Sequence, residues 1–331
     1  MIDHLIATSG NGSFADPNNP LLQTLWDSTS LGALKECPTK YFWQNICGLR
    51  SKAPRDPLVF GIAFHRAMQI YHYHRASKSD HLSSMEAALD AGIKAYVNPD
   101  KTLYQAQKKD RGFYALCRAI VWHLDHFNQE GFKDDPAQTL VLQNGKPAAE
   151  LSFKFHFCTI DGIDFYLCGH FDTLVEFNNQ NFVKDYKTSS SLGQNFFDQF
   201  SPDNQMSLYI LGGGVVLQKP VAGAIIDGIQ CAVHFNRFQR GFVYMSPEIL
   251  AEFTEDTQLW IEQAKLFASR GHYPKNEKSC DKYGGCPYRD ICRTPPSLRD
   301  NLIKTKYVQE IWDPSIDREE DAAPNLEETK P

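Results

Sequence analysis

The sequence contains no run of 18 or more apolar residues, the length that a membrane-spanning helix requires. Near its N-terminus it has Asp3 and His4, where a signal peptide would carry basic residues followed by an apolar stretch. We therefore expect a soluble, cytoplasmic protein with no membrane partner. Basic residues are also in deficit, because 34 Lys and Arg stand against 40 Asp and Glu. The resulting net charge of -6 argues mildly against a nucleic-acid partner.

The negative charge is unevenly distributed along the chain. Residues 313–331 contain seven acidic and two basic residues, a net charge of -5, so the remainder of the chain is close to neutral. A nearly neutral body can still present a basic groove to phosphate groups. The stretch 313–331 is rich in Pro, Glu and Asp and has few large apolar residues, which predicts a disordered acidic tail.

No internal repeat is present, and the residue pattern changes along the chain. Residues 1–27 are rich in Asn, Gly, Ser and Pro, which predicts a poorly ordered N-terminus. Helical patterns dominate residues 28–147, and alternating apolar and polar residues then predict strands joined by tight turns within residues 148–270. We expect an α/β fold in which a mixed central β-sheet is flanked by helices.

Two carboxylates and a lysine are predicted to meet on adjacent strands. In VKDYKT, Asp185 and Lys187 point to one face of the strand and Tyr186 points to the other. Asp172 lies on the preceding strand, and a turn at residues 178–180 would bring it opposite Asp185. Two close carboxylates repel each other unless a cation lies between them, and Mg²⁺ or Mn²⁺ suits such an oxygen site. The hairpin alone is also compatible with a cross-strand ion pair on a solvated face.

Nine cysteines, an odd number, argue against a complete disulfide framework. Cys280, Cys286 and Cys292 are spaced C-x5-C-x5-C within a cysteine-rich segment that we place at residues 271–300. Three thiolates need a fourth ligand to hold a cluster or a tetrahedral metal ion, and the alternative is three cysteines in a mobile tail. Five others are expected to be ordinary packing residues: Cys47, Cys117, Cys158, Cys168 and Cys231.

The runs GHFDTLVEF, NFVKDYKT and NQMSLYI resemble the nuclease core of the PD-(D/E)XK superfamily, in its RecB-like branch. That branch includes the AddB-type and CRISPR-associated adaptation nucleases. The resemblance implies a restriction-endonuclease-like core in which Asp172, Asp185 and the backbone carbonyl of Tyr186 bind the metal ion. It also implies that Lys187 orients the attacking water or offsets charge on the phosphate. Phe171 stands where the family name places Pro, a position that varies.

Three further matches extend the resemblance. GIAFH supplies His65 at the place of a histidine that joins the metal shell in the branch. Gln205 and Tyr209 match a catalytic Gln-x-x-x-Tyr pattern and would lie one helical turn apart on one face. Glu150, in AAELSF, matches an upstream glutamate to which we assign a supporting catalytic role. Three histidines have no such support and are expected on the surface: His72, His74 and His81.

The resemblance also implies a fourth ligand for the late cysteines. Cys37, in LKECPTKYFW, matches the lone N-terminal cysteine that iron-sulfur members of the branch combine with three C-terminal ones. By resemblance, Cys37, Cys280, Cys286 and Cys292 hold a structural [4Fe-4S] cluster that joins the N- and C-terminal segments. From the ligands alone, zinc would serve as well.

These features together predict a Mg²⁺- or Mn²⁺-dependent DNA nuclease. The branch that the chain resembles implies an exonuclease acting on single-stranded or end-containing DNA in replication, recombination or repair, with helicase or recombination proteins as partners. Two other hypotheses remain open: a non-catalytic DNA-binding scaffold that retains the fold, and a zinc protein unrelated to nucleases. Metal-dependent turnover of labelled DNA would separate the first of these from a nuclease, and a brown sample absorbing near 400 nm would exclude the second.

Overall fold

The computed structural model describes residues 15–52, 56–98, 100–128, 135–142, 145–282, 285–311 and 313–314. Residues 315–331, to which most of the predicted acidic tail belongs, lie outside the described residues. The chain forms two compact units. The first comprises Met1–Ala53, Phe153–Gly169 and Ser246–Ile316, and the second comprises Pro54–Ser152, His170–Met245 and Asp317–Pro331.

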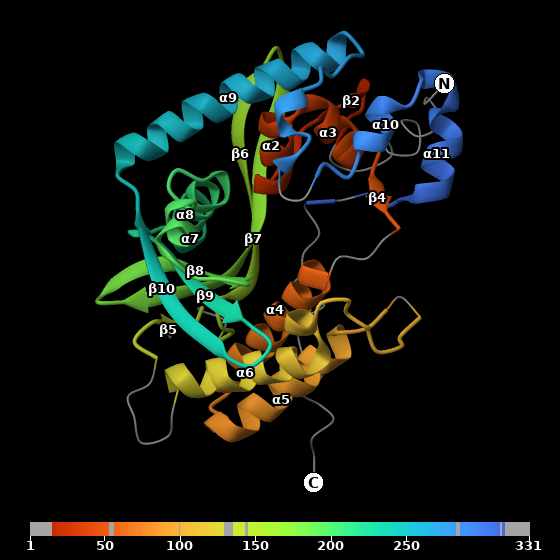
Figure 1. The fold of residues 1–331 in the computed structure, drawn as a ribbon. Coiled ribbons are helices and arrows are strands. Elements are labelled where there is room, and N and C mark those ends of the chain that lie inside the picture. Colours follow the sequence, from red (N-terminus) through yellow and green to blue (C-terminus); the bar gives the residue numbers. More distant parts are fainter. Residues whose placement is uncertain are drawn as a thin grey trace. The chain divides into compact units, whose positions relative to one another are not determined.

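A seven-stranded mixed sheet organises the described chain (Figure 1). Its strand order is β10-β9-β8-β7-β3, and β5 and β6 also pair with β7. The β8–β9 and β3–β7 pairs are parallel, whereas β7–β8 and β9–β10 are antiparallel. The predicted α/β class with a mixed sheet is therefore confirmed. The strands are β3 (Leu25–Trp26), β5 (Gln138–Thr139), β6 (Ala149–Ile160), β7 (Ile163–Phe177), β8 (Gln180–Ser189), β9 (Gly223–Cys231) and β10 (Asn236–Tyr244).

The β7–β8 hairpin sets the register on which the candidate site depends. Asn178 and Asn179 both have positive φ, 50° and 61°, which is the backbone conformation of a tight hairpin turn. The turn pairs Thr173 with Lys184, and the same register places Asp172 opposite Asp185. The sequence prediction for this pair of strands is confirmed.

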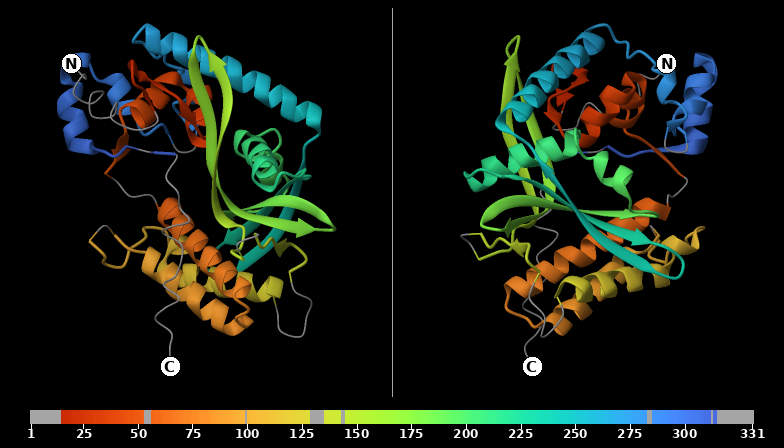
Figure 2. Two further views of the ribbon diagram at one scale, coloured as in Figure 1. Left: turned by 180° about the vertical axis from the view of Figure 1, so that it is seen from behind. Right: turned by 60° about the vertical axis from the view of Figure 1, so that its left-hand side comes forward.

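In the second unit, helices cover both faces of β8 and β9 (Figure 2). On one side, α4 (Asp56–Ala76), α5 (His81–Ala95) and α6 (Phe113–Asn128) bury a core that includes Tyr186 and Ile229. On the other side lie α7 (Gln194–Asp198) and α8 (Asn204–Leu217), with Gly213 close to Val183. Because side chains alternate along β8, Asp185 and Lys187 share the α8 side with Val183, whereas Lys184 and Tyr186 face the other helices.

The first unit combines residues from both ends of the chain. Leu49, Tyr288 and Ile303 belong to one buried cluster of this unit, so segments about 240 residues apart pack together. Its remaining elements are β1 (Ala15–Asp16), β2 (Asn19–Gln23), α2 (Ser28–Glu36), α3 (Pro38–Tyr41), η1 (Phe42–Ile46), β4 (Leu49–Ser51), α9 (Pro247–Ser269), η3 (Glu277–Ser279), α10 (Arg289–Arg293), η5 (Pro296–Leu298), α11 (Arg299–Lys306) and β11 (Tyr307–Gln309).

Two features of this organisation differ from the sequence predictions. Residues 15–26, predicted to be poorly ordered, carry β1, β2 and β3, in which Leu22 and Trp26 are buried. The sequence predicted segments that follow one another along the chain, but each compact unit is assembled from separate stretches of the chain. Strand β7, for example, contributes residues to both units. Long-range pairing of this kind leaves no mark in local composition. Within the described residues, no helix has the length and apolar character needed to cross a bilayer.

Candidate metal centre

Three predicted site residues converge from three elements of the second unit. His65 lies on α4, Glu150 near the start of β6, and Asp172 on β7, and one ligand atom from each lies within 4.8 Å of the others. Glu150 has a φ of 53°, in the left-handed region that a glutamate rarely adopts. Such a conformation costs of order 1–3 kcal/mol and persists only where the surroundings enforce it. The structure therefore places Glu150 among the candidate ligands, beyond the supporting role predicted from the sequence.

His65 connects Asp172 to the backbone of Tyr186. Its Nδ1 lies 2.9 Å from Oδ1 of Asp172, and its Nε2 lies 3.0 Å from the carbonyl oxygen of Tyr186. Both partners are acceptors, so the ring donates through both nitrogens, which only the imidazolium form can do. Burial lowers the pKa of His65, but the carboxylates of Asp172, Asp185 and Glu150 outweigh it and raise that pKa to about 9. The ring thus balances negative charge collected at this point.

Asp172 is fixed by a second bond to the neighbouring strand. The backbone N–H of Tyr186 donates to Oδ2 of Asp172 over 2.8 Å. Burial raises the pKa of Asp172, but His65 and then Lys187 more than offset it, so that this pKa lies below its ordinary value. Asp172 is therefore ionised at neutral pH, with one oxygen held by His65 and the other by the backbone of Tyr186.

Asp185 and Lys187 occupy the same face of β8. Asp185 is 1% exposed, and the Lys187 Nζ lies 2.5 Å from its Oδ2. Among the described residues, this ammonium is the partner of that buried oxygen, and no other group donates to it. Burial, against the attraction of Lys187, raises the pKa of Asp185 to about 6. A carboxylate placed in this way is a suitable ligand for a hard divalent cation.

Gln205 and Tyr209 extend the site onto α8. Lys187 donates to Oε1 of Gln205 over 3.0 Å, and Nε2 of Gln205 donates to the Tyr209 hydroxyl over 3.0 Å. The N-cap of α8 is Asp203, whose side chain accepts from the backbone N–H groups of Gln205 and Met206. The predicted helix therefore forms, and its first turn holds Gln205 against Lys187.

The donor set fits a hard divalent cation. Carboxylate oxygens of Glu150, Asp172 and Asp185, the Tyr186 carbonyl and one imidazole nitrogen are the ligand types that Mg²⁺ and Mn²⁺ accept. Sequence reasoning listed all of these residues, and the structure brings them together in one unit. It shows the arrangement of the groups, while their roles remain proposals.

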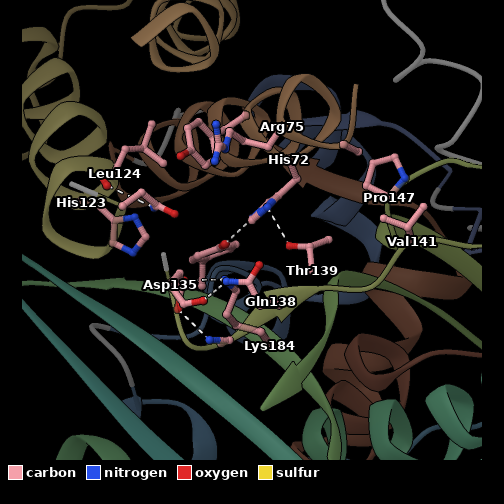
Figure 3. Close-up of a pocket in the computed structure, with 15 residues that line it drawn as sticks. His72, Arg75, His123, Leu124, Asp135, Gln138, Thr139, Val141, Pro147 and Lys184 are labelled. Atoms are coloured by element: carbon pink, nitrogen blue, oxygen red, sulfur yellow. Dashed lines mark hydrogen bonds and ion pairs between the residues drawn. The ribbon is translucent and has the colours of Figure 1, made fainter. Parts of the chain in front are cut away.

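The other face of β8 borders a second polar cavity, of about 250 Å³ (Figure 3). His72 lines it and lies between two hydroxyl groups, with Nε2 2.7 Å from the Tyr186 hydroxyl and Nδ1 2.9 Å from that of Thr139. Burial lowers the pKa of His72 to about 3 and keeps the ring neutral. His72 was expected on the surface, so this prediction is wrong, and so is that for His81, which is 6% exposed and bonded to Tyr71.

Beside this cavity lies a network of paired charges. Arg240 binds both oxygens of Asp135, at 2.6 and 2.7 Å, and also donates to Asp227 at 3.0 and 3.1 Å. Lys184, 1% exposed, lies 3.6 Å from Asp135, and Nε2 of His123 lies 3.2 Å from Asp227. These partners are up to 105 residues apart in the chain, and no sequence motif marks them.

The four predicted cluster cysteines all lie in the first unit. Cys37 separates α2 from α3, and its Sγ accepts from the backbone N–H of Asn276 over 3.3 Å. Burial raises the pKa of the Cys286 thiol, with smaller contributions from the charges of Cys280 and Cys37. Burial and then the charges of Cys286 and Cys37 do the same for Cys292. Among the described residues, no three of the sulfurs lie within 4.8 Å of one another.

A family model described as the PD-(D/E)XK nuclease superfamily matches residues 28–293, a range that contains every predicted site residue. No curated protein sequence matches the chain. Among solved structures, a candidate exonuclease from Eubacterium rectale is 12% identical, with 84% of this chain and 92% of that chain covered, at a TM-score of 0.46. A protein named SSO0001 is 13% identical, with 71% and 95% covered, at a TM-score of 0.30.

Proposed function

This chain belongs to the PD-(D/E)XK nuclease superfamily, and we propose that it is a metal-dependent deoxyribonuclease whose centre lies where α4, β6, β7 and β8 meet. One observation carries the proposal: the ligand atoms of His65, Glu150 and Asp172 lie within 4.8 Å of one another. Lys187 stands beside this group on the strand that supplies Asp185. Carboxylates gathered next to a lysine are the groups that phosphodiester hydrolysis requires.

Each residue has a distinct part in this proposal. Asp172, Asp185 and Glu150, with the Tyr186 carbonyl, would hold a divalent cation, and His65 would release its proton to join them. When bound, that cation would polarise a phosphate oxygen and make water a stronger acid. Lys187 would orient water or offset negative charge on the phosphate, while Gln205 and Tyr209 keep its ammonium in place.

The substrate proposal is single-stranded or end-containing DNA, the class implied by the branch that the motifs resemble. The near-neutral body of the chain is compatible with this substrate, since the acidic excess is concentrated in residues 313–331. We further propose that the enzyme is an exonuclease serving replication, recombination or repair.

The direct test is digestion of end-labelled single- and double-stranded DNA with and without Mg²⁺ or Mn²⁺. We expect degradation only when the metal is present and a free end is available, and circular single-stranded DNA serves as the control without ends. Asp185→Asn should abolish turnover while the far-ultraviolet circular dichroism spectrum is unchanged. Degradation by the Asp185→Asn variant at the wild-type rate would contradict the proposed metal centre. Cleavage of circular single-stranded DNA would contradict the exonuclease assignment.

We also propose that Cys37, Cys280, Cys286 and Cys292 hold a [4Fe-4S] cluster with a structural role. Zinc is the alternative occupant, because four thiolates suit either a zinc ion or the cluster. Anaerobically purified protein should be brown and absorb near 400 nm, and Cys286→Ser should lose this absorption. Cys117→Ser, at a cysteine of the other unit, is the matched control. A colourless protein containing zinc would contradict the proposal.

A further inference from the structure

The first two turns of α4 present an apolar surface to solvent. Leu58 is 60% exposed and Ile62 is 56% exposed, one helical turn apart, with Gly61 between them. The opposite face of the same turns is packed, because Phe60 and Phe64 are fully buried in the core with α5 and α6. Two large aliphatic side chains on one exposed turn form a small apolar platform, which we define as Leu58, Gly61 and Ile62.

This platform continues into the candidate metal centre. It lines one end of a groove of about 370 Å³, and His65 and Glu150 line the same groove. Arg66 also lines it and donates to Oε1 of Gln69 over 2.6 Å. The groove has the size of pockets that hold small ligands, roughly 300–1,000 Å³. A molecule lying along it would therefore contact apolar side chains and two candidate metal ligands at once.

The platform is held rigidly at its N-terminal end. Asp56, the first residue of α4, accepts from the Tyr104 hydroxyl over 2.7 Å and from the backbone N–H of Lys108 over 2.8 Å. These bonds tie the start of the helix to a segment about 50 residues further along the chain. A surface fixed in this way loses little entropy when a ligand settles on it.

We propose that the platform binds the unpaired base of the nucleotide next to the scissile phosphate of single-stranded DNA. The inference rests on the proposed function, since that function places a phosphate at the metal centre. Leu58 and Ile62 offer no partner to a charged phosphate, whereas the apolar faces of a base gain from such a surface. In duplex DNA, stacked neighbours cover both faces of each base, so the platform favours unpaired, unstacked substrates.

Gly61 provides the sharpest test of this platform. A Cβ added there meets nothing within 4 Å, so Gly61→Leu adds a side chain in the groove whose first carbon has open space around it. The substitution also raises helix propensity, because glycine is poor inside a helix. We expect an unchanged or higher melting temperature together with a roughly tenfold or greater fall in kcat/KM on single-stranded DNA. Gly32→Leu is the matched control, because Gly32 is also helical and free of neighbours within 4 Å.

A double variant removes the apolar contact without filling the groove. Leu58→Gln combined with Ile62→Gln should raise KM for oligo-dT about tenfold, the loss expected for exposed aliphatic contacts of this size. The same variant should bind a fully abasic oligonucleotide as the wild type does. Leu259→Gln, on α9 with 58% exposure, is the matched control and should change neither value.

The two hypotheses fail in different ways in this experiment. Initial rates are measured in Mg²⁺, and binding of fluorescent oligo-dT and abasic oligonucleotide is measured in EDTA. Equal loss of affinity for both oligonucleotides would overturn the base contact while leaving the nuclease in place. Unchanged kcat/KM in the Gly61→Leu variant would also overturn it and would favour a protein partner for this surface. Wild-type protein that neither binds nor cuts DNA would contradict the proposed function and the platform together.

Discussion

The two faces of β8 carry similar residues in different electrostatic states. On one face, Lys187 is paired with Asp185, and two further carboxylates, Asp172 and Glu150, gather around His65. On the other face, Lys184 belongs to a network in which Arg240 pairs bidentately with Asp135 and also binds Asp227. Successive residues of one strand thus enter two kinds of polar cluster.

Under the proposed function, the first of these faces is arranged for chemistry and the second for stability. Under the same proposal, ligands that receive a cation converge with their negative charges incompletely matched, which costs stability. Burial, with a smaller contribution from the charge of Asp172, raises the pKa of Asp185 to about 6. The paired network behind β8 satisfies its charges internally and contains no such excess. Lysine content alone does not reveal which face is which, since each face has one lysine.

The same substitution, lysine to methionine, tests both faces of β8 at Lys187 and Lys184. We expect the largest change in kcat of all the variants at Lys187. Lys187→Met should lower kcat by about 10²- to 10³-fold, the usual cost of losing one group that stabilises transition-state charge. Its melting temperature should stay close to that of the wild type. Lys184→Met should leave kcat within about threefold, because the contacts of Lys184 lie on the face away from the centre. Steady-state rates on single-stranded DNA, with thermal melts, check both; comparable kcat losses in the two variants would contradict the division.

Asp227 tests the proposed stabilising role of the paired charges on the other face of β8. It is fully buried and binds Arg240 and His123, so Asp227→Asn leaves a buried guanidinium without one of its partners. We expect the free energy of unfolding to fall by about 3–5 kcal/mol. The kcat per folded molecule should remain near the wild-type value. Urea titration followed by circular dichroism gives the first quantity; a variant of unchanged stability and lost activity would assign Asp227 to the chemistry instead.

Tyr186 is the residue that joins the two faces. Its backbone binds Asp172 and His65, whereas its hydroxyl lies 2.7 Å from Nε2 of His72 behind the strand. Tyr186→Phe removes the hydrogen bond to His72, which contributes about 0.5–1.5 kcal/mol to holding the Tyr186 backbone in position. We expect the Mg²⁺ concentration for half-maximal activity to rise about fivefold. At saturating Mg²⁺, kcat should recover. A metal titration of activity shows whether it does, and a loss of kcat that persists at saturation would contradict a positioning role.

The smallest change in kcat is expected at Tyr209, the last residue of the hydrogen-bonded series Lys187–Gln205–Tyr209. The Tyr209 hydroxyl touches Gln205, which in turn touches Lys187, so Tyr209→Phe acts through two intermediaries. We expect kcat to fall about two- to fivefold with no change in the metal requirement. Single-turnover rates would detect this; a loss as large as that of Lys187→Met would mean that Tyr209 contacts the substrate itself.

Local rules were sufficient to predict which residues of the candidate centre face one another. The turn at Asn178 and Asn179 and the alternation along two strands fix which residues of β7 and β8 face each other, so Asp172 and Asp185 could be paired from the sequence. The i, i+4 spacing likewise predicted that Gln205 and Tyr209 share one helix face. Asp203 caps that helix and sets where its first turn begins.

The remaining features depend on contacts between distant segments. Glu150 approaches the metal centre through an unusual backbone conformation that its neighbours in the sequence do not require. His72 meets Tyr186 across 114 residues, and Asp135 meets Arg240 across 105, so neither contact follows from periodicity or spacing. For the same reason, residues 15–26 looked unstructured until their pairing partners were known, β7 among them.

The central claim is that the groups gathered around Asp172 bind a divalent cation that DNA cleavage requires. Titration of Mn²⁺ followed by electron paramagnetic resonance, on samples whose nuclease activity is assayed in parallel, tests it most directly. We predict saturable binding by the wild-type protein, activity that rises with occupancy, and loss of both in Asp172→Asn. Wild-type Mn²⁺ affinity in that variant, or cleavage without any bound metal, would contradict the account.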